Sequence, residues 1–569
     1  MRRTTILFLV FFYFSLTSYS QDNSGLLLQS DLPEHYLNIE LDTRDQISDL
    51  ANHYSIDHIE YNPAEAVYEV RIWLSKPDYP RFAESGMPFT FHNPDLSKSR
   101  IAMAKNFQVL ASGWDRYPTY QAYEETMSHF QLEYPEFCRI DTIMAHTPAG
   151  HKILAARIGK REEADYHKPA VFYSAAIHGD EVVGYYILLR FIDYILTHPD
   201  EPVVNQILEE IDLWICPLEN PDGTYYSGDH IVGLSPISTR GNNQGYDLNR
   251  SYPGMNGNTS ASYLPEIEAM MDFTEKNNFV MSIGLHSGAE VFNYPWDAYT
   301  SFQKNHPDSR WWNLIGRKFV DTCRKNSPRY FNSARDGVTP GGNWYIIRGS
   351  RQDFMNYHRR CREATLEISY PKIADRQQLP VYWENLKDAL LNYTLESLYG
   401  IKGIVKDAAT GEPLRARIFI EGYDDAAQNS DIFSALTNGV YHRPLIPGTY
   451  SVTFSSDGYI TQTHDITVHS GTLFLPVNLD RSNSVDENTP STICLYPNPV
   501  SDQVNIRIID PGWLYSRVNI LNTEGKILRS ITISDYLTIF DLNAYPPGIY
   551  FINIHHKTGN IFTEKILKK

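Results

Sequence analysis

The sequence predicts an α/β domain with a mixed, mostly parallel sheet flanked by helices, followed by two small all-β sandwich domains. Between about residues 116 and 397, short apolar runs that suit buried strands alternate with runs of helical period, an alternation typical of α/β domains. From 398 to 480, and again from 492 to 569, helical periodicity disappears and short β-branched runs are separated by turn signals. A polar linker, 481–491, divides these two β-rich segments.

Individual elements can be placed within the α/β segment. Apolar runs predict strands at Ala170–Ile177, Ile211–Cys216, Val280–Leu285 and Ala364–Ile368. Helical periodicity predicts helices at Glu181–Leu196, Tyr263–Lys276, Trp311–Lys325 and Tyr382–Leu398. In sheets of this kind, functional sites form where strands end and loops begin. We therefore expect the residues that carry chemistry to lie at the ends of these strands.

The N-terminus has the features of an export signal. Arg2 and Arg3 precede an apolar run of eleven residues, Ile6–Leu16, and small residues follow. This run is shorter than the roughly 20 residues that cross a bilayer. Residues 1–20 are therefore predicted to be a cleaved signal peptide, and the mature chain is expected to have no transmembrane segment. Residues 21–115 follow as an N-terminal region or prosegment with one strand-like stretch, Val67–Leu74, and the sequence assigns it no task.

Composition excludes one class of partner and leaves the redox state open. Acidic residues outnumber basic ones by 68 to 50, and the formal charge is −18. Nucleic acid is not expected as a partner, because phosphate binding needs a basic surface. The chain has five cysteines and no CxxC pair, at positions Cys138, Cys216, Cys323, Cys361 and Cys494. The first four could form a disulfide in an exported protein or remain buried free thiols.

Metal-ligand residue types follow two of the predicted strands. His178-Gly179-Asp180-Glu181 comes directly after one strand, and His286 ends another. A histidine and a glutamate three residues apart at a strand-to-helix turn can face the same side. Catalytic zinc takes three such nitrogen and oxygen ligands and keeps a fourth position open. A single histidine or glutamate in such a position would more often have a structural role. The zinc interpretation therefore depends on finding these ligand types at the ends of two strands.

Charged residues of a second kind lie elsewhere in the α/β segment. Arg240 precedes Asp247-Leu248-Asn249-Arg250, and arginine binds carboxylates through two parallel hydrogen bonds. Glu367 lies inside an apolar strand. A carboxylate buried among hydrophobic residues is costly unless it has a partner or a function.

Together these residues resemble the zinc metallocarboxypeptidase family, most closely its carboxypeptidase N/E branch, over about residues 116–480. The matching features are HxxE at 178–181, NPDG at 220–223, DLNR at 247–250, His286, and Tyr345 placed 22 residues before Glu367. The segment that opens Gly400-Ile401-Lys402-Gly403 resembles the transthyretin-like domain of this branch. Ser251-Tyr252 and Ser287-Gly288 depart from the usual family pattern, but they remove no catalytic group.

The resemblance implies a carboxypeptidase fold and a role for each matched residue. His178, Glu181 and His286 would bind one Zn²⁺ per chain, which lowers the pKa of water to about 7. Glu367 would serve as general base and acid, and Arg240 would stabilise the oxyanion. Asn249 and Arg250 would bind the terminal carboxylate of a peptide or protein, and Tyr345 would close over the substrate.

Two further residues predict a preference for C-terminal Lys or Arg. Asp297 lies eleven residues after His286, and Gln352 lies fifteen before Glu367, which are the positions that line the side-chain pocket in the N/E branch. A cation buried in such a pocket needs a paired carboxylate. Asp297 could instead cap a turn, in which case the pocket would be nonspecific.

The last segment resembles the C-terminal sorting domain of the type IX secretion system. The residues are LYPNPVSDQVNIRI at 495–508, PPGIYFINI at 546–554 and the closing KILKK. With the signal peptide, it implies passage through the periplasm and outer membrane by way of that machinery, and then a secreted or cell-surface protein.

The sequence thus predicts a secreted zinc metallocarboxypeptidase that hydrolyses the C-terminal peptide bond. One alternative keeps this chemistry and changes the substrate to cell-wall peptides or polyglutamate. Another is a catalytically silent surface-binding protein. Such a protein would be expected to lack Glu367 or a metal ligand, and all of these residues are present.

Overall fold

The computed structural model describes residues 33–92, 101–160, 167–231, 238–255, 264–482, 493–496, 498–523, 525–533, 536–556 and 561–569. These residues form two compact units, which divide between Arg481 and Ser482. The signal-peptide segment and most of the linker lie outside the described residues.

The centre of the first unit is an eight-stranded sheet in the order β13-β12-β14-β11-β9-β10-β8-β7. Its middle strands are parallel: β9 (Ala170–Ala175) pairs with β10 (Asp212–Cys216) and β11 (Phe279–His286), and β11 pairs with β14 (Arg362–Ser369). Antiparallel strands flank them: β7 (Cys138–Met144) and β8 (Ile153–Ile158) on one side and β12 (Ala289–Tyr294) on the other, with a short β13 (Val338–Pro340) at the edge. The mixed, mostly parallel sheet is confirmed.

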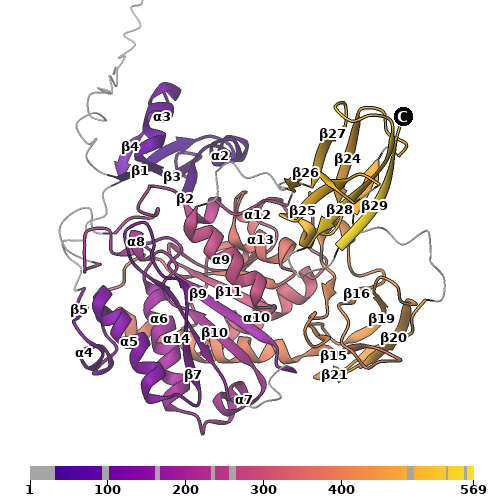
Figure 1. The fold of residues 1–569 in the computed structure, drawn as a ribbon. Coiled ribbons are helices and arrows are strands. Elements are labelled where there is room, and N and C mark those ends of the chain that lie inside the picture. The colour runs from indigo at the N-terminus through magenta and orange to yellow at the C-terminus, as the bar shows by residue number, and fades with distance from the viewer. Residues whose placement is uncertain are drawn as a thin grey trace, which may run out of the picture. The chain divides into compact units, whose positions relative to one another are not determined.

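Helices cover both faces of this sheet (Figure 1). Alternate residues of β9 show the division, because Val171 and Tyr173 enter one core and Phe172 enters the other. The larger core is closed by α5 (Tyr120–Glu133), α6 (Val183–Thr197), α7 (Pro202–Glu210), α10 (Ser309–Arg324) and α14 (Gln378–Leu395). The smaller core lies under α9 (Pro265–Lys276) and α13 (Arg351–His358). Each face of the sheet is therefore buried, as the continuous apolar strands require.

The four expected strands and four expected helices are present, with shifted ends. The expected helix at Glu181 begins only at Val183, because residues 176–182 form the turn that leaves β9. Strand β11 extends one residue further than expected and ends on His286. Cys138, Cys216, Cys323 and Cys361 are buried, and no disulfide joins any two of these four.

Residues 33–92 form a separate four-stranded antiparallel sheet, where the sequence suggested only one strand. The order is β2-β3-β1-β4, from β1 (Glu34–Leu41), β2 (Ser55–Asn62), β3 (Val67–Ser75) and β4 (Thr90–His92). Helices α2 (Arg44–Ala51) and α3 (Tyr79–Ser85) contribute Ile47, Leu50 and Phe82 to its core. Beyond it, the short strands β5 (Met103–Ala104) and β6 (Tyr117–Pro118) and helix α4 (Phe107–Ala111) lead into the central domain.

Residues 400–479 form a β-sandwich with its own apolar core. One sheet runs β18-β15-β21, with β22 also paired to β15, and the other runs β17-β16-β19-β20. The strands are β15 (Gly400–Asp407), β16 (Arg417–Ile420), β17 (Ile432–Phe433), β18 (Val440–Arg443), β19 (Gly448–Ser455), β20 (Gln462–Val468), β21 (Thr472–Phe474) and β22 (Val477–Leu479). Val405, Ile418 and Val452 lie in the core between the two sheets.

A buried ionic network joins this sandwich to the α/β domain. Arg443 of β18 donates hydrogen bonds to the carboxylate of Asp308, through Nη2 at 2.9 Å and Nη1 at 3.2 Å. Asp308 also accepts a hydrogen bond from Arg362 Nε at 3.0 Å. All three side chains are almost completely buried, and the two guanidinium groups hold the pKa of Asp308 below its usual range against the effect of burial. Arg443 also donates to Asp424 Oδ1 of its own domain at 2.8 Å, so the buried network continues from the α/β domain into the sandwich.

The second unit, from Ser482 onward, is a β-sandwich of two sheets, β23-β24-β27 and β26-β25-β28-β29. Its strands are β23 (Ile493–Tyr496), β24 (Gln503–Ile508), β25 (Arg517–Leu521), β26 (Ile527–Thr532), β27 (Leu537–Asp541), β28 (Gly548–His555) and β29 (Ile561–Lys568). Val504, Val518 and Ile552 are buried between the sheets. Across the described ranges of both units, no helix combines the length and apolar character needed to cross a bilayer.

Candidate active site

Three adjacent parallel strands bring the predicted site residues to one edge of the central sheet. In the register, Leu285 of β11 lies opposite Ala175 of β9, and His286 lies opposite Glu367 of β14. His178 follows Ala175 by three residues, so it leaves the sheet at the same edge. The parallel pairing thus converts three segments that are distant in sequence into neighbours.

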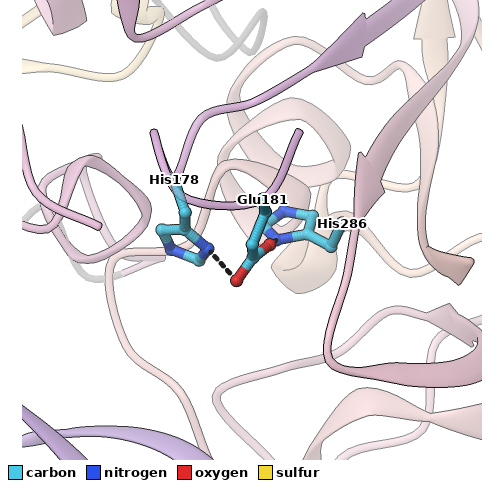
Figure 2. Close-up of side chains that lie close together, drawn as sticks. All are labelled: His178, Glu181 and His286. Carbon is cyan, nitrogen blue, oxygen red and sulfur yellow. Dashed lines mark hydrogen bonds and ion pairs between the residues drawn. The ribbon is translucent and has the colours of Figure 1, made fainter. Parts of the chain in front are cut away.

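His178, Glu181 and His286 form a compact buried cluster (Figure 2). One ligand atom from each residue lies within 4.8 Å of the others. The Glu181 carboxylate bridges the histidines, with Oε1 3.0 Å from His178 Nδ1 and Oε2 2.9 Å from His286 Nδ1. Two imidazoles and one carboxylate are the donor set of many catalytic zinc sites, so the residues present fit this metal.

The surroundings prepare the cluster for a cation. The other ring nitrogen of His178, Nε2, lies 3.1 Å from Asp247 Oδ1, and such outer carboxylates commonly orient a ligating histidine. Burial would raise the pKa of Glu181, but the two histidines more than offset it, and the pKa lies well below its usual range. Burial lowers the pKa of His286 to about 4. Glu181 is therefore ionised and His286 neutral, the states in which these groups bind metal. Burial and Arg240 would lower the pKa of His178, but Glu181 and Asp247 raise it above its usual value.

Two glycines explain why the HxxE and NPDG motifs occur together. A Cβ atom on Gly179 would lie only 2.4 Å from the backbone of Gly223, so the chain segments approach more closely than any side chain allows. Thr224 Oγ1 donates to the Gly179 carbonyl at 2.9 Å, and the Asn220 side chain accepts from Gly223 N–H. The NPDG turn therefore supports the backbone between the two ligands His178 and Glu181.

Arg240 lies beside the cluster and is held by carboxylates. Its Nε donates to Asp247 Oδ2 at 3.1 Å, and its Nη1 donates to Glu181 Oε1 at 3.3 Å. Asp247 also accepts from the Asn249 N–H at 2.9 Å. One buried aspartate therefore connects a metal-ligand histidine, the arginine and the segment that carries Asn249.

Most of the predicted substrate-binding residues line one cavity with the cluster. Asn249, Arg250, Tyr345, Asp297 and Glu367 all lie on its wall with His178, Glu181, His286 and Arg240. Asn249 Oδ1 accepts the Arg351 N–H at 2.9 Å, which leaves its amide nitrogen free to donate elsewhere. Arg250 lies 4.0 Å from Asp247, too far for a strong pair.

Glu367 is a buried carboxylate with unused hydrogen-bonding capacity. Its Oε2 has no hydrogen-bond partner among the described residues. Burial raises its pKa well above the usual value, the nearby Glu181 raises it further, and Lys372 and Arg240 oppose both effects. A raised pKa makes the carboxylate a stronger base, which suits a group that takes up a proton and passes it on.

Asp297 lines this cavity, Gln352 lines a smaller one that shares Asn249 and His286 with it, and the two side chains together form an acidic recess. Gln352 Nε2 donates to Asp297 Oδ1 at 2.8 Å and contacts Asn293 Oδ1 at 3.2 Å, while Gln352 Oε1 is a buried acceptor that no described residue satisfies. Burial raises the pKa of Asp297 to about 6. The recess therefore offers two acceptors and a charge that is present at neutral pH.

The N-terminal sheet contributes residues that the sequence analysis missed. Asp57 of β2 lines the cavity, with its carboxylate 2.5 Å from Lys372 Nζ and 3.8 Å from Arg240. Tyr36 of β1 donates to Asp180 at 2.5 Å, and Ser55 donates to Asp247 at 2.7 Å. Nothing in their local sequence separates these residues from ordinary strand residues, because their significance comes only from the docking of the sheet.

Glu34 strengthens that docking through backbone contacts. Its carboxylate accepts the Arg240 N–H at 2.9 and 3.0 Å and the indole N–H of Trp73 at 2.8 Å. Burial raises the pKa of Glu34 to about 7, and the nearby Asp180 adds to the rise. The N-terminal sheet is therefore attached directly to the segments that carry Arg240 and Asp180.

Residues 123–389 match the zinc carboxypeptidase family, and residues 494–569 match the secretion system C-terminal sorting domain. The chain contains a zinc carboxypeptidase domain. Its sorting domain marks it for export by the type IX secretion system, so the protein is secreted or held at the cell surface. The metal of this carboxypeptidase family is zinc, and the His178–Glu181–His286 cluster is compatible with it.

Relatives of the carboxypeptidase domain occur in animals and plants. Carboxypeptidase D of Anas platyrhynchos is 31% identical over 415 residues, which are 69% of this chain and 28% of that protein. The catalytic chain of carboxypeptidase N of Mus musculus is 27% identical over 434 residues, 69% of this chain and 92% of that protein. The chain spans 25% of carboxypeptidase D of Drosophila melanogaster, at 29% identity over 367 residues. The structure of carboxypeptidase A from Helicoverpa armigera aligns with 64% of this chain over 96% of its own length. The sequence identity is 17% and the TM-score is 0.48.

The metal cluster generates a test that does not depend on activity. Purified protein is expected to hold about one zinc per chain, measured by elemental analysis, because three ligands with an open position make a single catalytic-type site. His286→Ala is expected to lose most of this zinc, whereas His53→Ala, a change at an exposed histidine of the N-terminal sheet, is expected to retain it. Equal zinc content in all three proteins would show that the metal binds elsewhere.

Proposed function

We propose that this protein is a secreted zinc metallocarboxypeptidase that removes the C-terminal residue of peptides or proteins, with a preference for Lys and Arg. The observation that carries the proposal is the shared cavity. The metal-ligand cluster, the buried Glu367 and the carboxylate-binding candidate Arg250 line the same wall. This combination places hydrolytic groups within reach of a chain terminus, which an endopeptidase would not need.

Selection for the chain end rests on Arg250 and Asn249. Arg250 Nη1 donates to the Asn249 carbonyl at 3.0 Å, which orients the guanidinium beside the free amide of Asn249. A guanidinium and an amide donor together suit a terminal carboxylate. Tyr345 lies on the same cavity wall and covers the bound residue.

Hydrolysis then uses the residues at the strand ends. When bound by His178, Glu181 and His286, zinc supplies Lewis-acid activation of water and of the scissile carbonyl. Glu367 accepts the proton of the attacking water and delivers it to the departing amine, as its raised pKa allows. Arg240 donates to the oxyanion that develops in the transition state and so lowers its energy.

The preference for basic residues rests on Asp297 and Gln352. A departing Lys or Arg side chain would pair with the Asp297 carboxylate and donate to the unsatisfied Gln352 Oε1. A departing glutamate would meet Asp297 with like charge, which disfavours polyglutamate as the substrate. Cell-wall peptides remain an alternative where they end in a basic residue. The intact ligand cluster and Glu367 argue against a silent binding protein.

Export rests on the C-terminal unit, which we propose engages the type IX secretion machinery. The match over residues 494–569 supports this partner. The proposed signal peptide at residues 1–20 would direct the chain to the periplasm first.

We further propose that residues 33–92 act as a prosegment that holds the cavity closed. The Asp57 carboxylate pairs with Lys372 and lies near Arg240, the proposed oxyanion donor. Arg240 and Lys372 lower the pKa of Asp57 below its usual value even though burial acts in the opposite direction. Asp57 is therefore a permanent negative charge in the space that the acyl part of a substrate would occupy. The β-sandwich at 400–479 would be the transthyretin-like domain that accompanies this class of enzyme.

The general base can be tested by an isosteric change. Glu367→Gln is expected to lower kcat by several orders of magnitude while zinc content and thermal unfolding stay unchanged, because one carboxyl group serves both proton transfers. Glu290→Gln, on the neighbouring strand and outside the cavity lining, is the matched control and should retain activity. A near-normal kcat in Glu367→Gln would assign this residue a structural role.

The specificity pocket can be tested with acylated dipeptides that differ only in the last residue. Asp297→Asn is expected to lower kcat/KM for C-terminal Arg about 100-fold, near 3 kcal/mol for a buried pair, and to change C-terminal Ala little. Because the pKa of Asp297 is raised to about 6, the Arg-to-Ala ratio should fall as the pH drops below 6 and the carboxylate becomes protonated. Equal rates for Arg, Phe and Glu in the wild type would exclude a basic pocket.

The prosegment proposal predicts a gain of activity in the full chain. Asp57→Asn removes the charge beside Arg240 and Lys372 and is expected to raise kcat/KM at least about tenfold, which corresponds to about 1.4 kcal/mol. Asp49→Asn changes an exposed aspartate of the same domain and is expected to have no effect. If Asp57→Asn is no more active than the wild type, the N-terminal sheet does not restrain the site through this contact.

A further inference from the structure

A short segment of the β-sandwich, Asp425–Asp431, lies behind the specificity pocket. It joins β16 to β17 and contains a 3₁₀ turn at Ala426–Gln428. Gln428 Oε1 accepts the indole N–H of Trp296 at 2.6 Å. Trp296 is 1% exposed and Gln428 is 9% exposed, so this bond is buried at the junction of two domains.

Trp296 precedes Asp297, the acid proposed to bind the departing side chain. The main chain here is already fixed by the α/β domain: Asp297 N–H donates to Asp353 Oδ1 at 2.8 Å, and the Trp296 carbonyl accepts the Gly342 N–H at 2.8 Å. The Asp297 carbonyl also accepts the Ile347 N–H at 3.0 Å, and the indole N–H of Trp296 donates to Gln428 of the sandwich. A buried indole N–H without an acceptor would turn or shift to find one, and Asp297 would move with it.

Gln428 is itself held in the orientation that this contact requires. Its Nε2 donates to Asp425 Oδ2 at 2.8 Å, which fixes the amide nitrogen on one side and the oxygen toward Trp296. Asp425 in turn accepts the Ala427 N–H at 2.9 Å. The acceptor is therefore preorganised before Trp296 packs against it.

The same segment contacts the other wall of the pocket. Asn429 Nδ2 donates to the Tyr357 carbonyl at 3.1 Å, and Arg360 donates to Asn429 Oδ1 at 3.2 Å. Tyr357 lies near the end of α13, the helix that carries Gln352. One segment of the β-sandwich thus touches both chain segments that form the recess at Asp297 and Gln352.

We propose that Gln428 is a positioning residue for the specificity pocket, acting through Trp296 on Asp297. The β-sandwich then sets substrate selectivity, although it supplies no group to the cavity. The inference rests on the proposed function, in which the departing side chain binds at Asp297.

The test compares selectivity, because a purely structural role would lower the rates for all substrates alike. In the full-length protein, kcat and KM are measured for acylated dipeptides ending in Arg or Ala. Gln428→Leu is expected to reduce the Arg-to-Ala ratio of kcat/KM about tenfold, mainly through KM for Arg, with little change for Ala. Gln462→Leu, a glutamine on β20 that bonds only within the sandwich, is the matched control.

A second variant keeps the test decisive if Gln428→Leu folds poorly. Trp296→Phe removes the indole donor. If Gln428 acts through that donor, adding Gln428→Leu to Trp296→Phe should change the Arg-to-Ala ratio of kcat/KM less than twofold. Calorimetric binding of the two dipeptides in the Glu367→Gln background gives the same comparison without turnover.

Three results would contradict the proposals in different ways. A high wild-type ratio that Gln428→Leu leaves unchanged overturns the inference alone. Full additivity of the two substitutions shows that Gln428 does not act through Trp296, which also overturns it. A wild-type ratio near one removes the proposed Lys and Arg preference, and this inference with it.

Discussion

The parallel register of β9, β11 and β14 is the constraint on which the rest of the site depends. It sets His286 opposite Glu367 and brings the turn after β9 to the same edge, so that the ligands and the proposed base meet without any long-range loop. Strands packed on both faces cannot slide by one residue without moving every apolar side chain to the wrong core. The geometry of the cluster is therefore as rigid as the hydrophobic core itself. The close approach of Gly179 to Gly223 extends this rigidity to the turn between the ligands.

Charge balance is the second organising feature. The cavity concentrates buried carboxylates around the metal cluster, and each has a cationic or hydrogen-bonding neighbour apart from one oxygen of Glu367. Asp247 alone orients three residues of the site, because its carboxylate contacts His178, Arg240 and Asn249. The N-terminal sheet adds a further carboxylate, Asp57, to the cavity, and Lys372 pairs with it. An added negative charge of this kind is tolerated in the cavity only where a cation faces it.

Sequence patterns were sufficient for the four parallel strands at the centre of the sheet, four of the helices on its faces and the ligand cluster. Apolar period and motif spacing are local signals, and His178, Glu181 and His286 stand at strand ends that such signals identify. The N-terminal sheet was not predicted. Only Val67–Leu74 was recognised as strand-like, although β1 also alternates buried and partly exposed residues. Tyr36, Asp57 and Lys372 escaped notice for a different reason. Their partners lie far away in sequence, and no spacing rule connects them before the domains are docked. Gln428 was missed for the same reason, because its partner Trp296 lies far away in sequence.

The ionic network of Asp308, Arg362 and Arg443 has a consequence for biosynthesis. The first two residues are made well before Arg443, which arrives only with strand β18 of the sandwich. Until then, the α/β domain carries a surface where Asp308 lacks the second of its two arginine partners. We expect this surface to stay open to water until the sandwich packs against it. Completion of the hydrolytic domain is thereby tied to synthesis of the sandwich, and a chain shortened by a premature stop codon would be a ready target for quality-control proteases.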